Sequence, residues 1–222
     1  MFKHEGPSRG LQRNAILAAY LALVAGFVDS GGYLLSGSFT SHVTGNIARV
    51  TTTVAQGAPG ALAVALLVAA FFFGALFASV LLESGIFSRR PRAYGTALLL
   101  QGGLLALYLA RGQIIVLCVA MGMQNSLVTR LSGAVVRTTH LTGVLTDLGI
   151  EVARWLRWGA RAAARPSSST VALLMTITGA FSVGAFTGAM AVAWWGVDAM
   201  AAPAVAVTVA SLYAFVIDGR AA

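Results

Sequence analysis

The chain has 222 residues, of which 58% are hydrophobic and only 10% are charged, and its formal net charge is +8. Soluble domains carry about 25% charged residues, so this chain has too little polar surface to cover a globule in water. The basic residues stand in short clusters between long apolar runs, which argues against a nucleic-acid-binding surface and is typical of membrane proteins.

Six apolar stretches dominate the chain, each suited to a transmembrane helix, which needs about 20 mostly apolar residues. In chain order they are residues 14–35, 60–82, 94–110, 113–131, 170–193 and 200–217. The first follows Lys3, Arg9 and Arg13, as in a signal peptide, but it has no convincing cleavage site and is expected to be retained as a helix. Two further segments, 43–56 and 141–158, are helix-like but more polar. The first holds Asn46 and Arg49, and the second holds Asp147, Glu151, Arg154 and Arg157.

Two parts of the chain carry the same pattern in the same order. Residues 26–30 (Gly-Phe-Val-Asp-Ser) correspond to residues 122–126 (Gly-Met-Gln-Asn-Ser), and Leu-Ser-Gly follows each at the same offset. After a two-residue insertion in the second copy, His42-Val43-Thr44-Gly45 corresponds to His140-Leu141-Thr142-Gly143. The alternative is chance similarity between two segments rich in glycine and alanine. The pattern favours a single membrane domain over residues 1–222 with two repeats, about 12–110 and about 113–218.

The basic clusters discriminate between two topologies. If both polar segments cross the membrane, eight crossings result, and the loop Arg89–Arg92 lies opposite the N-terminus. If each segment dips into the membrane and returns, six crossings result. The positive-inside rule then places on the cytoplasmic side the N-terminus, Arg89–Arg92, Arg154, Arg157, Arg161, Arg165 and Arg220, with Arg111 alone outside. The second topology is favoured.

In this topology the two repeats have opposite orientations in the membrane. We therefore expect an all-α integral membrane protein with about six transmembrane helices plus two short re-entrant or broken helices, arranged as two inverted repeats. Its N- and C-termini are expected to be cytoplasmic.

Asp29 is the sharpest single candidate, because an ionisable residue at membrane depth is expected to have a function. It could carry a proton, since burial raises the pKa of a carboxylate, or it could bind a cation. The alternatives are a structural ion pair with Arg130 or Arg49, or an interfacial position reached by water. Its counterpart in the second repeat, Asn125, cannot titrate.

The starts of the two polar segments carry further candidates. A helix that begins within the bilayer leaves its first N–H groups without partners, so its start must face protein, water or a solute. Thr44 and Thr142 stand where N-caps would stand, and the glycine after each lets a backbone or a solute come close. Alternatively, these residues only cap and pack the helices. His42 and His140 are candidates for proton relays or hydrogen-bond donors.

These arguments predict one substrate or ion site near the midplane of the membrane. Its expected members are Asp29, His42, Thr44, Gly45, Asn46, Gln124, Asn125, His140, Thr142 and Gly143. Arg49, Arg130 and Asp147 are expected in structural or gating ion pairs, with Arg49 and Asp147 facing each other from equivalent places in the two short helices.

Enzymatic activity is not expected, because the sequence holds no nucleophile elbow, P-loop, dinucleotide fingerprint or metalloprotease helix motif. No catalytic residue or cofactor is predicted. The histidines lack a cysteine or carboxylate at ligand spacing, so no metal site is predicted either.

Two signatures carry a resemblance to a known family. The first is Gly26-Phe27-Val28-Asp29 with Phe39-Thr40-Ser41-His42-Val43-Thr44-Gly45-Asn46, and the second is Gly122-Met123-Gln124-Asn125 with Thr138-Thr139-His140-Leu141-Thr142-Gly143. Over about residues 12–217 the chain resembles the YoaK-like family of bacterial polytopic membrane proteins, a domain of unknown function. The resemblance implies a multi-pass protein of the bacterial inner membrane and supplies no activity.

The expected function is secondary, proton-coupled transport of a small polar or anionic solute through a midplane site. A passive channel with half-helices and a non-transporting membrane scaffold or partner protein are the alternatives. The expected partners are the lipid bilayer and the solute, with no nucleic acid. Six helices make a thin wall around a solute path, so a second copy of the chain, in a homodimer, is a further candidate partner. Gly179, Ser182, Gly184 and Gly188 would permit close helix contact within one subunit or between two.

Overall fold

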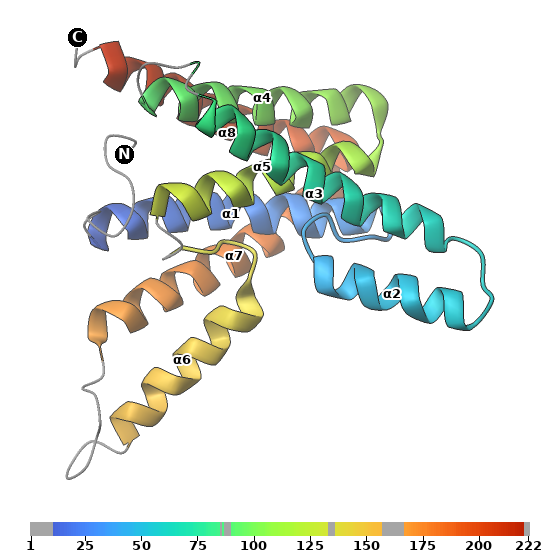
Figure 1. Ribbon diagram of the computed structural model, residues 1–222, viewed down its shortest axis with the longest axis horizontal. Coiled ribbons are helices and arrows are strands. Elements are labelled where there is room, and N and C mark those ends of the chain that lie inside the picture. Colours follow the sequence, from blue (N-terminus) through green and yellow to red (C-terminus); the bar gives the residue numbers. More distant parts are fainter. Residues whose placement is uncertain (1–10, 85, 87–89, 133–135, 157–166, 220–222) are drawn as a thin grey trace.

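The computed structural model describes residues 11–84, 86, 90–132, 136–156 and 167–219, and every element among them is helical (Figure 1). The helices are α1 Leu11–Ser36, α2 Val43–Ala55, α3 Ala61–Glu83, α4 Arg90–Arg111, α5 Ile114–Ser132, α6 Leu141–Leu156, α7 Ser168–Trp195 and α8 Ala201–Gly219. A short 3-10 helix, Gly196–Met200, joins α7 to α8. Outside the described residues lie several basic residues on which the predicted topology depends: Lys3, Arg9, Arg89, Arg157, Arg161, Arg165 and Arg220.

The structure confirms the prediction that the fold is all-helical. The six apolar stretches coincide with α1, α3, α4, α5, α7 and α8, and the two polar segments coincide with α2 and α6. Five continuous spans in the described part of the chain are long and apolar enough to cross a membrane. The last of them, Ser168–Val216, has 49 residues and is interrupted at Gly196, whose φ of 58° ends α7.

Large apolar side chains cover much of the outer surface of these helices. Phe72 and Phe73 of α3 are 59% and 60% exposed, and Phe186 of α7 is 68% exposed. Soluble proteins rarely leave such wide apolar surfaces open, because burying them away from water is favourable. Several helices of this composition indicate a multi-pass membrane protein.

The short helices α2 and α6 each run beside the long helix that follows them. After α1 the chain folds back, and α2 then runs next to α3 in the opposite direction (Figure 1). In the same way α6 runs next to α7 in the opposite direction. The starts of α1, α4 and α7 lie at one end of the molecule, together with the ends of α3, α5, α6 and α8 (Figure 1).

Helix α1 packs extensively against α7 and α3 against α5, and glycines let both pairs of backbones approach closely. A Cβ atom on Gly26 of α1 would overlap the carbonyl oxygen of Phe181 in α7, and one on Gly184 of α7 would overlap that of Leu23. A side chain at either glycine would therefore push the two backbones apart. Gly188 also faces α1, whereas Gly179 has no neighbour within 4 Å among the described residues.

The crossing of α5 with α3 uses the equivalent positions. Gly122, the counterpart of Gly26 in the repeated sequence pattern, approaches the carbonyl oxygen of Phe71 in α3. Gly74 of α3 approaches the carbonyl oxygen of Val119 in α5. Each half of the chain thus packs its first helix against the third helix of the other half, with glycines in matching places.

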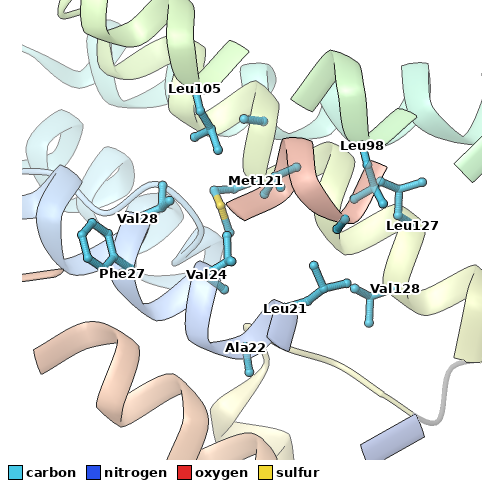
Figure 2. Packing of buried hydrophobic residues seen from close by; sticks show 14 of the residues in the cluster. Leu21, Ala22, Val24, Phe27, Val28, Leu98, Leu105, Met121, Leu127 and Val128 are labelled. Carbon is cyan, nitrogen blue, oxygen red and sulfur yellow. The ribbon is translucent and has the colours of Figure 1, made fainter. Parts of the chain in front are cut away.

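The hydrophobic core joins helices of both halves. Figure 2 shows Met121 of α5 between Leu105 of α4 and Val24 of α1, and all three side chains are 2% exposed or less. Further residues of this core come from α7 and α8, among them Ile177 and Val207. The core therefore fixes α1, α4 and α5 relative to one another, and these helices carry the polar residues considered next.

Candidate functional site

Asp29 lies in the last two turns of α1 and holds the loop that follows the helix. One carboxylate oxygen, Oδ1, accepts three hydrogen bonds of 2.8 Å, from the backbone N–H of Thr40, the Thr40 hydroxyl and the backbone N–H of Ser41. Asp29 is 6% exposed. Because a loop residue has no helical partner for its N–H, the carboxylate satisfies groups that would otherwise be buried without acceptors.

Two side chains of α2 hold the same loop from the other side. The Asn46 side-chain amide donates to the carbonyl oxygen of Phe39 at 3.1 Å. Arg49 Nη1 donates to the carbonyl oxygen of Gly37 at 3.2 Å and to Ser38 Oγ at 3.0 Å. Loop 37–42 is thus fastened to both α1 and α2.

The start of α2 differs from the prediction. The first hydrogen bond of the helix runs from the Asn46 N–H to the carbonyl oxygen of His42, so the N-cap position belongs to His42 and Thr44 lies within the helix. A Cβ atom on Gly45 would overlap the His42 ring, which explains the glycine by local packing. The prediction that Thr44 is an N-cap is therefore wrong.

The start of α6 follows the same geometry. The Val144 N–H donates to the carbonyl oxygen of His140 at 3.1 Å, which places Thr142 inside the helix as well and corrects its predicted role as N-cap. Gly143 has no neighbour within 4 Å of the Cβ position among the described residues. His140, Thr142 and Gly143 are exposed, as are His42 and Thr44 in the first half.

Asn125 bonds the second loop, residues 136–140 before α6, through one side chain, whereas Asp29 bonds the first loop, residues 37–42, through three donors. Its side-chain amide and the Thr139 hydroxyl exchange hydrogen bonds, at 2.7 Å from Asn125 Nδ2 and 3.0 Å to Asn125 Oδ1. Thr138, which precedes Thr139 as Thr40 precedes Ser41, is fully buried, and its hydroxyl has no hydrogen-bond partner among the described residues. Ser132 Oγ at the end of α5 accepts a 3.0 Å hydrogen bond from the Val136 N–H.

The predicted ion pairs differ from those in the structure. Arg130 pairs with Glu83 of α3, and Arg49 contacts the loop carbonyl described above, so neither arginine pairs with Asp29. Asp147 is exposed on α6 and pairs with no basic residue of the described part of the chain. The predicted pair of Arg49 with Asp147 is wrong because α2 and α6 do not contact each other.

The predicted site residues form two clusters, one in each half. Asp29 and Asn46 are buried and Gly45 is half-buried in the first cluster, and Asn125 is half-buried in the second. Helices α1 and α5, which carry Asp29 and Asn125, contact each other. Gln124 of α5 is fully buried and belongs to neither cluster.

Gln101 is among the buried polar residues that sequence reasoning missed. Gln101 of α4 is fully buried, and its amide donates to Gln124 Oε1 at 2.7 Å, while Gln124 Nε2 donates to the carbonyl oxygen of Leu21 in α1 at 2.8 Å. The remaining oxygen of Gln101 has no partner among the described residues. The available signal was a single amide in an apolar helix followed by Gly102, which lets Thr208 of α8 approach.

A groove of about 570 Å³ lies between α1, α7 and the start of α8, and none of the cluster residues lines it. Its walls are mostly apolar and include Phe186, Trp194 and Trp195, which are all exposed. Asp198 stands at this groove as its one charged lining residue. No group of three or more metal-ligating side chains occurs in the described part of the chain.

Residues 17–213 match the family described as protein of unknown function (DUF1275). The chain belongs to this DUF1275 family. A search of curated proteins and a search of solved structures found no match.

Membership of DUF1275 confirms the predicted assignment to a family of unknown function and covers both loop clusters. The narrower YoaK-like resemblance and a bacterial source stay predictions. What the DUF1275 clusters can do chemically follows from their donors and acceptors: the first presents a carboxylate bound by its own loop, and the second presents a neutral amide beside a buried hydroxyl.

Proposed function

We propose that this DUF1275 protein is a secondary, proton-coupled transporter of a small polar or anionic solute. The observation that carries the proposal is the reciprocal packing of the two halves. The first helix of each half packs against the third helix of the other, α1 against α7 and α5 against α3, through glycines at equivalent positions. Halves related by a pseudo-two-fold axis in the membrane plane are common in secondary transporters, where the solute binds near the interface of the repeats.

Two inverted repeats require that α2 and α6 enter the membrane without crossing it, and their lengths favour this arrangement. The helices have 13 and 16 residues. At about 1.5 Å per residue they are about 20 Å and 24 Å long, less than the hydrocarbon core of about 30 Å. Irregular backbone is tolerated at membrane depth where protein groups satisfy it, and Asp29 does so for loop 37–42.

Six crossings follow from the long final span. A helix of 49 residues would be more than twice as long as the bilayer core is thick, and Gly196 divides this span into α7 and α8. The helix ends that adjoin the basic clusters then share one side of the membrane (Figure 1). The positive-inside rule makes this side the cytoplasm and places both termini there, in a bacterial inner membrane by the family resemblance.

We assign proton coupling to Asp29 because this acidic residue bonds loop 37–42 to α1. The charged carboxylate accepts three hydrogen bonds, and hydrogen bonds to a charged group are roughly twice as strong as neutral ones. Protonation of Asp29 would weaken all three bonds and loosen loop 37–42. Asn125 cannot respond in this way, so only the first half would sense the proton.

Uptake into liposomes tests the proposal. Wild-type protein is expected to give saturable uptake of at least one member of a panel of small polar and anionic solutes, and an imposed pH gradient is expected to change the rate. Asp29→Asn should remove the response to the gradient. Asp198→Asn, which removes an exposed carboxylate that belongs to neither cluster, should keep this response.

Other results would replace the proposal with one of the alternatives. Uptake that rises linearly with solute concentration and ignores the pH gradient would indicate a passive channel. Absence of uptake for the whole panel in correctly folded protein would indicate a scaffold or a partner of another membrane protein.

A further inference from the structure

The two loops offer equivalent hydrogen-bond donors but differ in the acceptor that they meet. In the first loop the Thr40 hydroxyl and the N–H groups of Thr40 and Ser41 converge on the Asp29 carboxylate. In the second loop the equivalent residues are Thr138 and Thr139, and the equivalent acceptor residue is the neutral Asn125. The only hydrogen bonds between Asn125 and these two residues go to the Thr139 hydroxyl.

In the second loop the Thr138 hydroxyl has no acceptor among the described residues. It is 0% exposed, and it lacks a partner among the described residues, whereas the equivalent Thr40 hydroxyl donates to a carboxylate at 2.8 Å. A buried hydroxyl without a partner costs about 1–3 kcal/mol, so a position of this kind calls for an acceptor. The first loop shows which acceptor fits these donors: the oxygen of a carboxylate.

We propose that the second loop binds the carboxylate group of a small anionic solute, whose oxygen takes at Thr138 and Thr139 the position that Asp29 Oδ1 takes at Thr40 and Ser41. The inference rests on the proposed transport function and narrows its solute class. The chain thus supplies its own carboxylate in one half and receives one from outside in the other.

Two features near the second loop suit a negative charge. The loop leads into α6, a helix of 16 residues whose N-terminal end carries a partial positive charge. Arg137, directly before Thr138, is exposed and pairs with no carboxylate among the described residues. No acidic residue precedes Asp147 in this loop or in the first turn of α6.

Binding of acetate to the purified full-length protein tests the inference, with chloride at equal concentration as the comparison. Wild type is expected to bind acetate and to gain thermal stability from it. Thr138→Val removes the hydroxyl at nearly constant shape and should weaken acetate binding about tenfold or more, as for the loss of one hydrogen bond to a charged group. Thr146→Val, on an exposed face of α6, should bind acetate like wild type.

Asn125→Asp supplies the sharper variant because it recreates the first loop in the second. The new carboxylate should accept from Thr138 as Asp29 accepts from Thr40, so acetate binding should be lost while the melting temperature stays equal or rises. Undetectable acetate binding by wild type, an equal response to chloride, or unchanged binding by both variants would overturn the inference.

The proposed function can fail separately. Thr138-dependent acetate binding without uptake into liposomes would keep the site and remove transport. Saturable uptake that is indifferent to Thr138→Val and Asn125→Asp would keep transport and remove this site.

Discussion

The loops after α1 and α5 share one sequence pattern and follow equivalent helices, yet different side chains bond them: a carboxylate in the first and an amide in the second. In the first loop a carboxylate gathers three donors, and Asn46 and Arg49 add contacts from α2. In the second loop an amide engages a single hydroxyl, and a neighbouring hydroxyl has no partner in the described part of the chain. Two loops with the same sequence pattern can therefore differ in their hydrogen bonding. The donors of the first have an acceptor within the protein, and one donor of the second has none among the described residues.

The largest expected effect tests whether the two halves are equivalent in packing. Gly26→Val and Gly122→Val should each prevent the protein from folding as a monodisperse species, because each new side chain would overlap a backbone carbonyl of the facing helix. Size-exclusion chromatography in detergent measures this outcome. Gly103→Val, at a glycine with open space around it, is the matched control and should stay monodisperse.

If only one of the two glycine variants loses monodispersity, the α1–α7 and α3–α5 contacts are not equally important for folding. The packing symmetry that supports the transport proposal would then lose its basis.

The next effect compares the two acceptors. Asp29→Ala should destabilise the protein by about 3 kcal/mol or more, since it leaves two backbone N–H groups and a hydroxyl without an acceptor. Asn125→Ala should cost about 1 kcal/mol, because it removes one side-chain contact. Thermal unfolding in detergent, followed for both variants under the same conditions, measures the difference. Equal losses would contradict the unequal roles of Asp29 and Asn125.

The last comparison concerns the two buried threonines, whose substitutions should change stability in opposite directions. Thr40→Val removes a hydrogen bond to a carboxylate and should lower stability by about 1.5–3 kcal/mol. Thr138→Val replaces a hydroxyl that has no partner, so without any bound anion it should be neutral or raise stability by about 1 kcal/mol. The same unfolding measurement in acetate-free buffer decides. A clear loss of stability in Thr138→Val would show that its hydroxyl already has an acceptor.

The helices were predictable from sequence because long apolar runs dominate their physics. The predicted stretch 60–82 became α3 Ala61–Glu83, and the predicted gap between 193 and 200 holds Gly196, where α7 ends. The matching contexts of Gly26 and Gly122, and of His42 and His140, are visible in the sequence, and their arrangement as inverted repeats stays a prediction. Local pattern and composition were sufficient for the helices.

The contacts within the clusters were not predictable in the same way. Sequence cannot show that the N–H groups of Thr40 and Ser41 lack backbone partners, so the role of Asp29 as their acceptor appears only with the loop in place. The predicted Arg49–Asp147 pair failed because Arg49 reaches its own preceding loop. Gln101 was missed because its importance depends on its hydrogen bond to Gln124 of a different helix, α5.

The interleaving of the halves has a consequence for biosynthesis. The glycine face of α1 can pack against α7 only after α7 has been synthesised, near the end of the chain. Helix α3 can pack against α5 after a shorter stretch of synthesis. Contacts between distant segments form late and leave intermediates exposed. A ribosome that stalls between α5 and α7 would therefore leave α1 unmatched in the bilayer, within reach of membrane quality-control proteases.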